Sequence, residues 1–182
     1  MDERPQQPPQ APLLPYPDVS MPLLAVCLCG IFAWRVYFAA GVNLLPDECS
    51  YWAWSRRLDW SYFDNSGMVA YLIRLSTEFF GESTPFSVRF PFLILSGLST
   101  FLLYCVSVNL YGNRQQALMA VVALNITPMA FLGAGAAIHD NALVFFWTLC
   151  LWAASRLINS LDLRWFYVMG VAAGLAIQSK YT

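Results

Sequence analysis

Two adjacent acids, Asp47 and Glu48, open the most polar stretch of a chain that is otherwise rich in apolar residues. Charged residues make up only 12% of the sequence and hydrophobic residues 58%, whereas a soluble domain is about 25% charged. Aromatic side chains that suit a membrane–water boundary follow the acids: Tyr51, Trp52, Trp54, Trp60, Tyr62 and Phe63. A carboxylate held at such a boundary can meet a lipid head group.

A simpler role for the two acids is to stabilise a helix. Pro46, Asp47 and Glu48 form a helix-start signature, with proline in the first turn and acids at the positive end of the helix dipole. Such acids contribute about 0.3–1 kcal/mol each, and capping alone would explain both. However, the helix would begin where an apolar run ends, so Asp47 would face the bilayer surface. Both interpretations stay open at this point.

Two further ionisable residues interrupt or end apolar runs. Asp140 separates two runs that would otherwise merge, and the alternative to a functional role is a solvated acid in a turn. His139 beside it is interpreted as a polar turn residue rather than a metal ligand. Lys180, the only lysine in the sequence, is either functional, as ionisable residues in membrane segments usually are, or an anchor that snorkels to the interface.

Four arginines complete the set of charged candidates. Arg56 and Arg57 follow the acid pair and could bind an anion, although they could equally be solvated or paired with phospholipid. Arg35 and Arg89 lie near the ends of apolar runs, from which their side chains can reach the interface. Their expected role is structural pairing with acids of the polar loop.

Long apolar runs must position these residues. Five apolar runs predict an all-α, multi-span helical bundle: 21–42, 86–111, 117–138, 142–158 and 165–177. The first three reach the roughly 20 residues that a bilayer requires, and the last two are at or below the lower limit. The connection 43–85 is the long polar loop. Helical spacing within it, and an apolar stripe that ends at Gly81, predict two helices, 47–58 and 66–80, lying at the membrane interface.

The remaining sequence features bound the domain and its orientation. Residues 1–18 are rich in Pro and Gln, which predicts a disordered tail rather than a signal peptide, so the membrane domain spans 19–182. Positive charges weakly favour the loop 43–85 outside and 111–116 inside. The net charge of −1 without a basic run gives no support for nucleic-acid binding. Four of the five cysteines lie in apolar runs, as small buried hydrophobes do, and no zinc or disulfide spacing is evident.

A series of motifs in fixed order resembles a known enzyme family. The segments are PDECSYWAWSRRLDWSYFDN, MVAYLI, FFGES, SVRFPF, LYGNRQQAL, HDNALVFFW and SKYT. They resemble polyprenyl-phosphate-sugar-dependent glycosyltransferases of the C superfamily, nearest to glycosyltransferase family 83 and its protein-mannosyltransferase-like relatives. The resemblance runs from Arg35 to Thr182 and stops in mid-pattern. The chain is therefore expected to be the amino-terminal part of a longer enzyme, and inactive alone.

The resemblance implies a role for each candidate. Asp47 would be the catalytic base, Glu48 would orient it, and Asp140 would be a second acid of the site. The residues expected to bind the donor phosphate or the substrate are Arg56, Arg57, Tyr51, Asp64 and Lys180. The sequence departs from the family pattern at 64–67, where Asp-Asn-Ser-Gly replaces Asp-His-Pro-Pro or Lys-Pro, and at 139–141, where His-Asp-Asn replaces Pro-Asp-Ala.

These roles describe sugar transfer from a polyprenyl-phosphate carrier to a lipid, glycan or protein acceptor outside the membrane. A carboxylate near the acceptor hydroxyl contributes about 10²–10⁴-fold, and the leaving phosphate needs positive charge or N–H donors. The resemblance implies a multi-pass protein of the plasma or inner membrane, with no nucleic-acid partner. No cofactor is certain, and a divalent cation stays open. The rival interpretations are a transporter, whose polar path would be lined by Arg35, Arg89, Asp140 and Lys180, and a non-catalytic membrane scaffold.

Overall fold

The computed structural model describes residues 21–62 and 65–180, and this part of the chain is helical. The predicted disordered tail, 1–18, lies outside the described residues. The helices, in chain order, are α1 (Met21–Gly41), α2 (Pro46–Ser55), α3 (Met68–Phe80), α4 (Pro85–Tyr111), α5 (Arg114–Ile126), α6 (Pro128–Gly133), α7 (His139–Ser160) and α8 (Arg164–Ser179).

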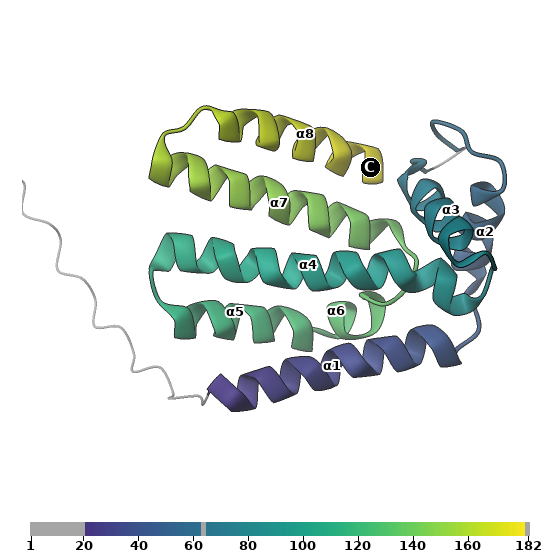
Figure 1. Ribbon diagram of the computed structural model, residues 1–182, viewed down its shortest axis with the longest axis horizontal. Coiled ribbons are helices and arrows are strands. Elements are labelled where there is room, and N and C mark those ends of the chain that lie inside the picture. Colours follow the sequence, from purple (N-terminus) through teal and green to yellow (C-terminus); the bar gives the residue numbers. More distant parts are fainter. Residues whose placement is uncertain (1–20, 63–64, 181–182) are drawn as a thin grey trace, which may run out of the picture.

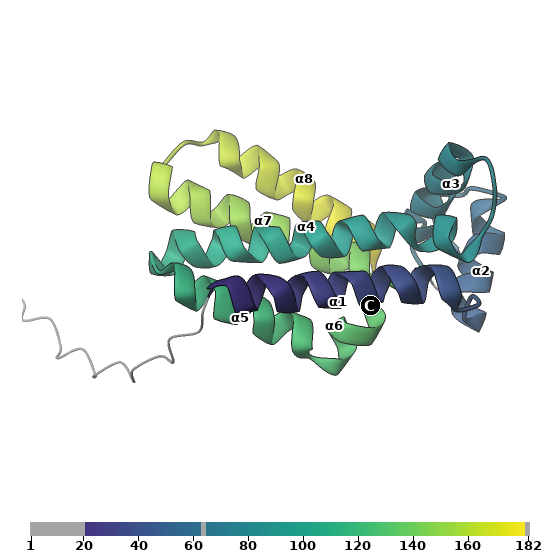
Figure 2. The ribbon, with the colours of Figure 1, turned by 60° about the horizontal axis from the view of Figure 1, so that its bottom comes forward.

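The long helices lie side by side in a bundle (Figure 1). Helix α8 packs on α7, α7 on α4, and α4 on α5, while α1 lies against α4 and α5. Helices α2 and α3 sit together at one end of the bundle, and the second view shows the same arrangement (Figure 2). The short connections between α4 and α5 and between α7 and α8 lie at the opposite end. The end that carries α2 and α3 is therefore also where α7 begins and α8 ends.

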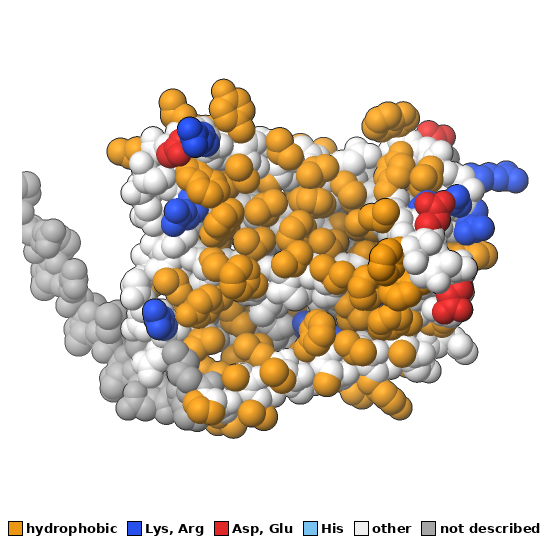
Figure 3. Space-filling view, viewed as in Figure 1, with side chains coloured by type: hydrophobic (Ala, Val, Ile, Leu, Met, Phe, Trp, Pro, Cys, Tyr) orange, Lys and Arg blue, Asp and Glu red, His pale blue; other side chains and the backbone are white. Residues whose placement is uncertain are grey.

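The surface of the bundle is that of a membrane protein. Helices α1, α4 and α7 are long and apolar enough to cross a bilayer. Hydrophobic side chains cover the middle of the face in Figure 3, and most of the charged side chains gather at its two ends. Large apolar side chains are exposed on all three helices, including Val26, Phe101 and Trp147. An exposed apolar surface of this extent marks contact with lipid or with another protein.

The third predicted membrane segment, 117–138, is not one continuous helix. It divides into α5 and α6 at Thr127, whose backbone is not helical. Pro128 follows, and a proline disfavours the helical conformation of the residue before it and cannot donate a backbone hydrogen bond. The Thr127 hydroxyl accepts a hydrogen bond from the Ala130 amide at 3.4 Å and so caps α6. Helix α8, with 16 residues, is also shorter than the roughly 20 needed to span a bilayer, so the count of five spans stays a prediction.

The polar loop contains the two predicted helices, with ends that differ by a few residues. Helix α2 stops at Ser55 rather than at residue 58, and α3 begins at Met68 rather than at 66. Gly81 ends α3 in the left-handed conformation, with φ of 71°, which glycine adopts without steric cost. Both helices pack on one core cluster, made of Val69, Ile73, Val88, Phe92 and Ala137. This core joins the loop to the start of α4 and to the segment before α7; the depth of the two helices in a membrane stays a prediction.

The cysteines differ from the expectation. Cys27 and Cys29 lie in an apolar run but are exposed on α1, and Cys105 and Cys150 are only half-buried. The physical reason is that the long helices present apolar side chains outward as well as inward, so an apolar run does not imply burial inside the protein.

Candidate active site at one end of the bundle

A buried ion pair between Glu48 and Arg89 holds the polar loop to the bundle. Both side chains are completely buried. The Arg89 Nε donates to Glu48 Oε1 at 2.8 Å, and its Nη2 donates to Glu48 Oε2 at 2.5 Å. This bidentate geometry is the strongest form of an arginine–carboxylate contact. It joins the first turn of α2 to the first turns of α4.

The remaining hydrogen-bonding groups of the pair are also satisfied. Glu48 accepts from the backbone amide of Ala137 at 2.7 Å and from that of Leu45 at 2.8 Å. Arg89 donates to the carbonyls of Val42 at 2.7 Å and Asn43 at 2.9 Å, just beyond the end of α1. The pair therefore ties together the end of α1, α2, α4 and the segment before α7.

Glu48 is held as a carboxylate. Burial by itself raises the pKa of its carboxyl group, but the hydrogen bonds from Arg89, Ala137 and Leu45, together with the positive charge of Arg89, outweigh burial. The pKa of Glu48 therefore lies below its ordinary value. The buried and fully bonded carboxylate of Glu48 holds the first turn of α2 against the bundle.

Asp47 has the opposite environment. It also lies in the first turn of α2, but its side chain is exposed and makes no hydrogen bond or ion pair with the described residues. Successive residues of an α-helix point about 100° apart, so the rotation that buries Glu48 turns Asp47 outward. Asp47 is consequently a free carboxylate on a helix end whose position is fixed by its neighbour.

A ring contact connects this part of α2 to the start of α7. Tyr51, one turn after Asp47, lies 4.6 Å from His139 between ring centroids, with the rings nearly perpendicular. His139 is the first residue of α7 and is buried, so the prediction of an ordinary polar turn residue was wrong. Tyr51 thus lies beside the residue that precedes Asp140.

Asp140 and Lys180 form the second ionic contact at this end. The Lys180 Nζ lies 2.9 Å from Asp140 Oδ1, and both side chains are about one-third exposed. The polar loop contacts the same end of α8, because the Ser66 hydroxyl donates to the carbonyl of Ser179 at 2.5 Å. The structure therefore brings Asp140 and Lys180 together, beside the loop that contains α2 and α3.

Other candidates do not converge here. Arg56 and Arg57 follow the far end of α2, about 14 Å from Asp47 along the helix axis at 1.5 Å per residue, and both are exposed. The guanidinium of Arg56 lies over the ring of Trp52 instead, 5.9 Å from its centroid. Asp64 lies outside the described residues. Within 21–62 and 65–180, no three His, Cys, Asp or Glu side chains gather where a metal could bind, so a divalent cation has no protein cluster there.

The predicted pairing of arginines with loop acids is confirmed for Arg89 and wrong for Arg35. The Nη2 of Arg35 donates instead to the carbonyl of Ala130, at 2.8 Å. That carbonyl lies in α6, which exists as a separate helix because Pro128 breaks the run. Pro128 indicated the break before α6, but no sequence signal indicated the contact itself.

Comparisons with known proteins agree with the resemblance. The profile of the family described as dolichyl-phosphate-mannose-protein mannosyltransferase matches residues 64–182. The chain is 26% identical over 154 residues to the lipid A galacturonosyltransferase RgtD of Rhizobium johnstonii, covering 84% of this chain and 32% of that protein. It is also 26% identical over 174 residues to undecaprenyl phosphate-alpha-4-amino-4-deoxy-L-arabinose arabinosyl transferase 2 of Proteus mirabilis, covering 86% and 31%.

The chain thus spans about a third of the length of these curated relatives. No solved structure matches it.

Proposed function

Because the chain belongs to the dolichyl-phosphate-mannose-protein mannosyltransferase family, we propose that it carries the acid site of a glycosyltransferase that takes its sugar from a polyprenyl-phosphate carrier. The family match includes Asp140 and Lys180 but begins after Asp47 and Glu48. The proposed role of Asp47 therefore depends on the geometry of α2.

The observation that carries the proposal is the contrast between the two adjacent acids. Glu48 is buried and bonded on both carboxylate oxygens, whereas Asp47 is exposed on the same helix turn. If the two acids only capped α2, Glu48 would not need its contacts with the buried Arg89 and with the Ala137 amide. The arrangement suits a general base that must stay in place while its carboxylate remains available.

In the proposed reaction, Asp47 takes the proton of the acceptor hydroxyl as the hydroxyl oxygen attacks the anomeric carbon. The bond between that carbon and the carrier phosphate oxygen breaks, and its electron pair stays with the phosphate. General-base assistance of this kind contributes about 10²–10⁴-fold. The leaving phosphate has low basicity, so it needs a nearby positive charge more than a proton.

Lys180 is better placed than Arg56 or Arg57 to supply the positive charge that the leaving phosphate needs. Its ammonium is held at the bundle end by Asp140 at 2.9 Å, yet both groups are partly exposed and can be reached by a ligand. In the proposal Asp140 positions Lys180, and Lys180 balances the charge of the departing phosphate. The two arginines lie toward the far end of α2 and are not assigned to this step.

The acceptor is proposed as a hydroxyl of a lipid-linked molecule at the outer membrane face. The support for a lipid acceptor is that one relative is named for lipid A. The relatives are named for different sugars, so the sugar is assigned only as a class, a glycosyl group carried on a polyprenyl phosphate.

The test supplies the complete enzyme, in membranes, with a radiolabelled sugar on either a polyprenyl phosphate or a nucleotide diphosphate. We expect label to enter a new glycoside only from the lipid-linked donor. Transfer from the nucleotide sugar would contradict the donor assignment. Movement of the lipid-linked donor across a sealed vesicle without glycoside formation would support the transporter alternative instead.

A further inference from the structure

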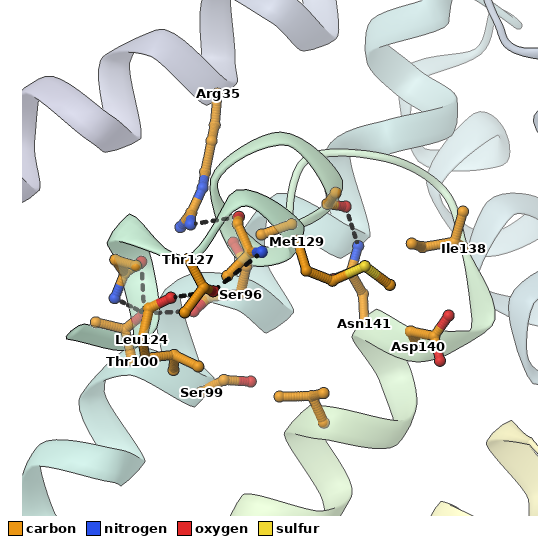
Figure 4. Close-up of a pocket in the computed structure, with 15 residues that line it drawn as sticks. Arg35, Ser96, Ser99, Thr100, Leu124, Thr127, Met129, Ile138, Asp140 and Asn141 are labelled. Atoms are coloured by element: carbon orange, nitrogen blue, oxygen red, sulfur yellow. Dashed lines mark hydrogen bonds between the residues drawn. The ribbon is translucent and has the colours of Figure 1, made fainter. Parts of the chain in front are cut away.

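A second polar feature, separate from Asp47, lies inside the bundle. A cavity of about 170 Å³ is lined by residues of α1, α4, α5, α6 and the start of α7. Figure 4 shows Arg35 reaching into it from α1, with Thr127, Ser96 and Asn141 on the surrounding elements. The volume is far above the roughly 10–15 Å³ that one water molecule needs, so a larger ligand can enter.

No acid among residues 21–62 and 65–180 balances the charge of Arg35 in this cavity. Arg35 is only 4% exposed. Its Nη2 bonds to the Ala130 carbonyl, but its Nε is buried without a hydrogen-bond partner, and it forms no ion pair with the described residues. Asp140 also lines the cavity, but its charge is already matched by Lys180 at 2.9 Å. One positive charge is left over.

A buried charge without a partner is costly, by several kcal/mol even after relaxation. The hydroxyls around the cavity do not relieve it. Those of Ser96, Ser99 and Thr100 donate to carbonyls of their own helix at 2.8–2.9 Å, and hydroxyl oxygens carry no net charge. An anion in the cavity beside the Arg35 guanidinium would balance this charge.

An apolar groove shares lining residues with the cavity. A neighbouring hollow of about 350 Å³ between α1 and α4 shares Arg35, Thr100 and Asn125 with the cavity. Its other walls include Leu28, Cys29 and Phe32 on α1. Cys29 and Phe32 are exposed on the bundle surface, so the groove leads from Arg35 to the face that contacts lipid. A ligand with an anionic head and an apolar chain fits both parts.

We propose that the cavity around Arg35 binds the phosphodiester of an anionic membrane phospholipid, whose acyl chain lies in the groove between α1 and α4. A single guanidinium without an acid matches a head group of one net negative charge. A zwitterionic head group would bring an ammonium group for which the cavity has no free carboxylate, because Asp140 is paired. Arg35 lies six residues before the end of α1, which is about 9 Å along the helix axis. A phosphate at this depth would lie inside the bundle rather than at its open end.

The test measures lipid bound to the complete protein in detergent by native mass spectrometry. Phosphatidylglycerol, phosphatidylcholine and a polyprenyl phosphate are titrated separately. We expect wild type to bind phosphatidylglycerol at least tenfold more tightly than phosphatidylcholine, and Arg35→Gln to lose this preference. The control variant Arg114→Gln, at the opposite end of the bundle, should keep it. Arg35→Lys retains the charge and should keep part of it.

The wild-type protein alone can also decide the question, in case Arg35→Gln does not fold. Phosphatidylglycerol should raise its unfolding temperature more than phosphatidylcholine does. Equal binding and equal stabilisation by the two phospholipids would overturn the proposal. So would a polyprenyl phosphate that displaces bound phosphatidylglycerol and depends on Arg35, because the carrier would then be the occupant. The proposal does not depend on transfer activity, so it can fail while the proposed function stands.

Discussion

At the scale of single residues, two adjacent acids on one helix turn have opposite environments. Glu48 holds α2 through Arg89, the amide of Ala137 and its own cap, while Asp47 remains exposed. The capping interpretation of the sequence is therefore correct for Glu48, which accepts from the Leu45 amide. Asp47 has no comparable structural partner among the described residues.

Glu48→Gln is expected to destabilise the protein strongly. The change leaves the buried Arg89 without a counter-charge, and breaking a buried pair in this way costs about 3–5 kcal/mol. Chemical unfolding in detergent measures the loss. Glu78→Gln is the matched control, because Glu78 pairs with Arg74 on an exposed face of α3 and such pairs contribute only about 0.3–0.5 kcal/mol. Equal, small losses in both variants would contradict a structural role for Glu48.

The same pair predicts a pH dependence. Because the folded protein holds the pKa of Glu48 below its ordinary value of 4.5, the stabilisation is complete above that value. It is lost as the pH falls from about 4.5 through the lower folded pKa. The unfolding temperature of wild type should drop across this window. Glu48→Gln should lack this part of the drop, and parallel curves for the two proteins would argue against it.

Asp140→Ala is expected to slow turnover less than the loss of the base does. The change releases Lys180 but leaves its positive charge in place. Because the pair is about one-third exposed, the free energy of unfolding should change by no more than about 1 kcal/mol. Transfer assays on the complete enzyme measure the effect, with Asp162→Ala at the opposite end as control. Asp140 lies in the first turn of α7 rather than in the turn that the alternative assumed, and turnover equal to wild type would leave it only its contact with Lys180.

At the scale of elements, the sequence predicted the helices better than the contacts between them. The apolar runs, the proline and acids in the first turn of α2, and Gly81 after α3 each indicated an element that the structure contains. The break at Thr127 was signalled by Pro128 but is hidden within an apolar run. The contacts from Glu48 to the amide of Ala137 and from Arg35 to the carbonyl of Ala130 could not be predicted, because backbone groups are the same at every residue.

The interfacial position of α2 and α3 is a prediction of this scale. Spin labels are placed singly along 46–55. Their accessibility to a lipid-soluble quencher and to a water-soluble quencher should vary along the chain with the period of a helix. The buried side of α2 near Trp52 should lie close to head-group depth. Labels along α5, which packs alongside α4 within the bundle, provide a comparison. A uniformly aqueous profile over 46–55 would place α2 away from the membrane.

At the scale of the whole molecule, the bundle places the candidate acids and the short connections at opposite ends. Which end faces outward is a separate prediction, drawn from weak charge asymmetry. Cys49 is exposed on α2, so a membrane-impermeant thiol reagent should modify it only from the outer face. Asn113→Cys, in the connection between α4 and α5, should react only from the inner face. The Asn113→Cys change is made in a protein that also carries Cys49→Ser, so that labelling of Cys49 does not contribute to the signal. Modification of each cysteine from the opposite face would reject the assigned reaction side.

The central claim concerns Asp47 and is tested most directly by the transfer rate of Asp47→Asn in the complete enzyme. The amide keeps the size of the side chain but removes the base. Loss of its favourable interaction with the helix dipole costs only about 0.3–1 kcal/mol, so the protein should fold and still bind the lipid-linked sugar. Loss of general-base assistance should slow transfer roughly 10²–10⁴-fold, equivalent to about 2.7–5.4 kcal/mol. A folded Asp47→Asn enzyme that transfers sugar at nearly the wild-type rate would contradict the account.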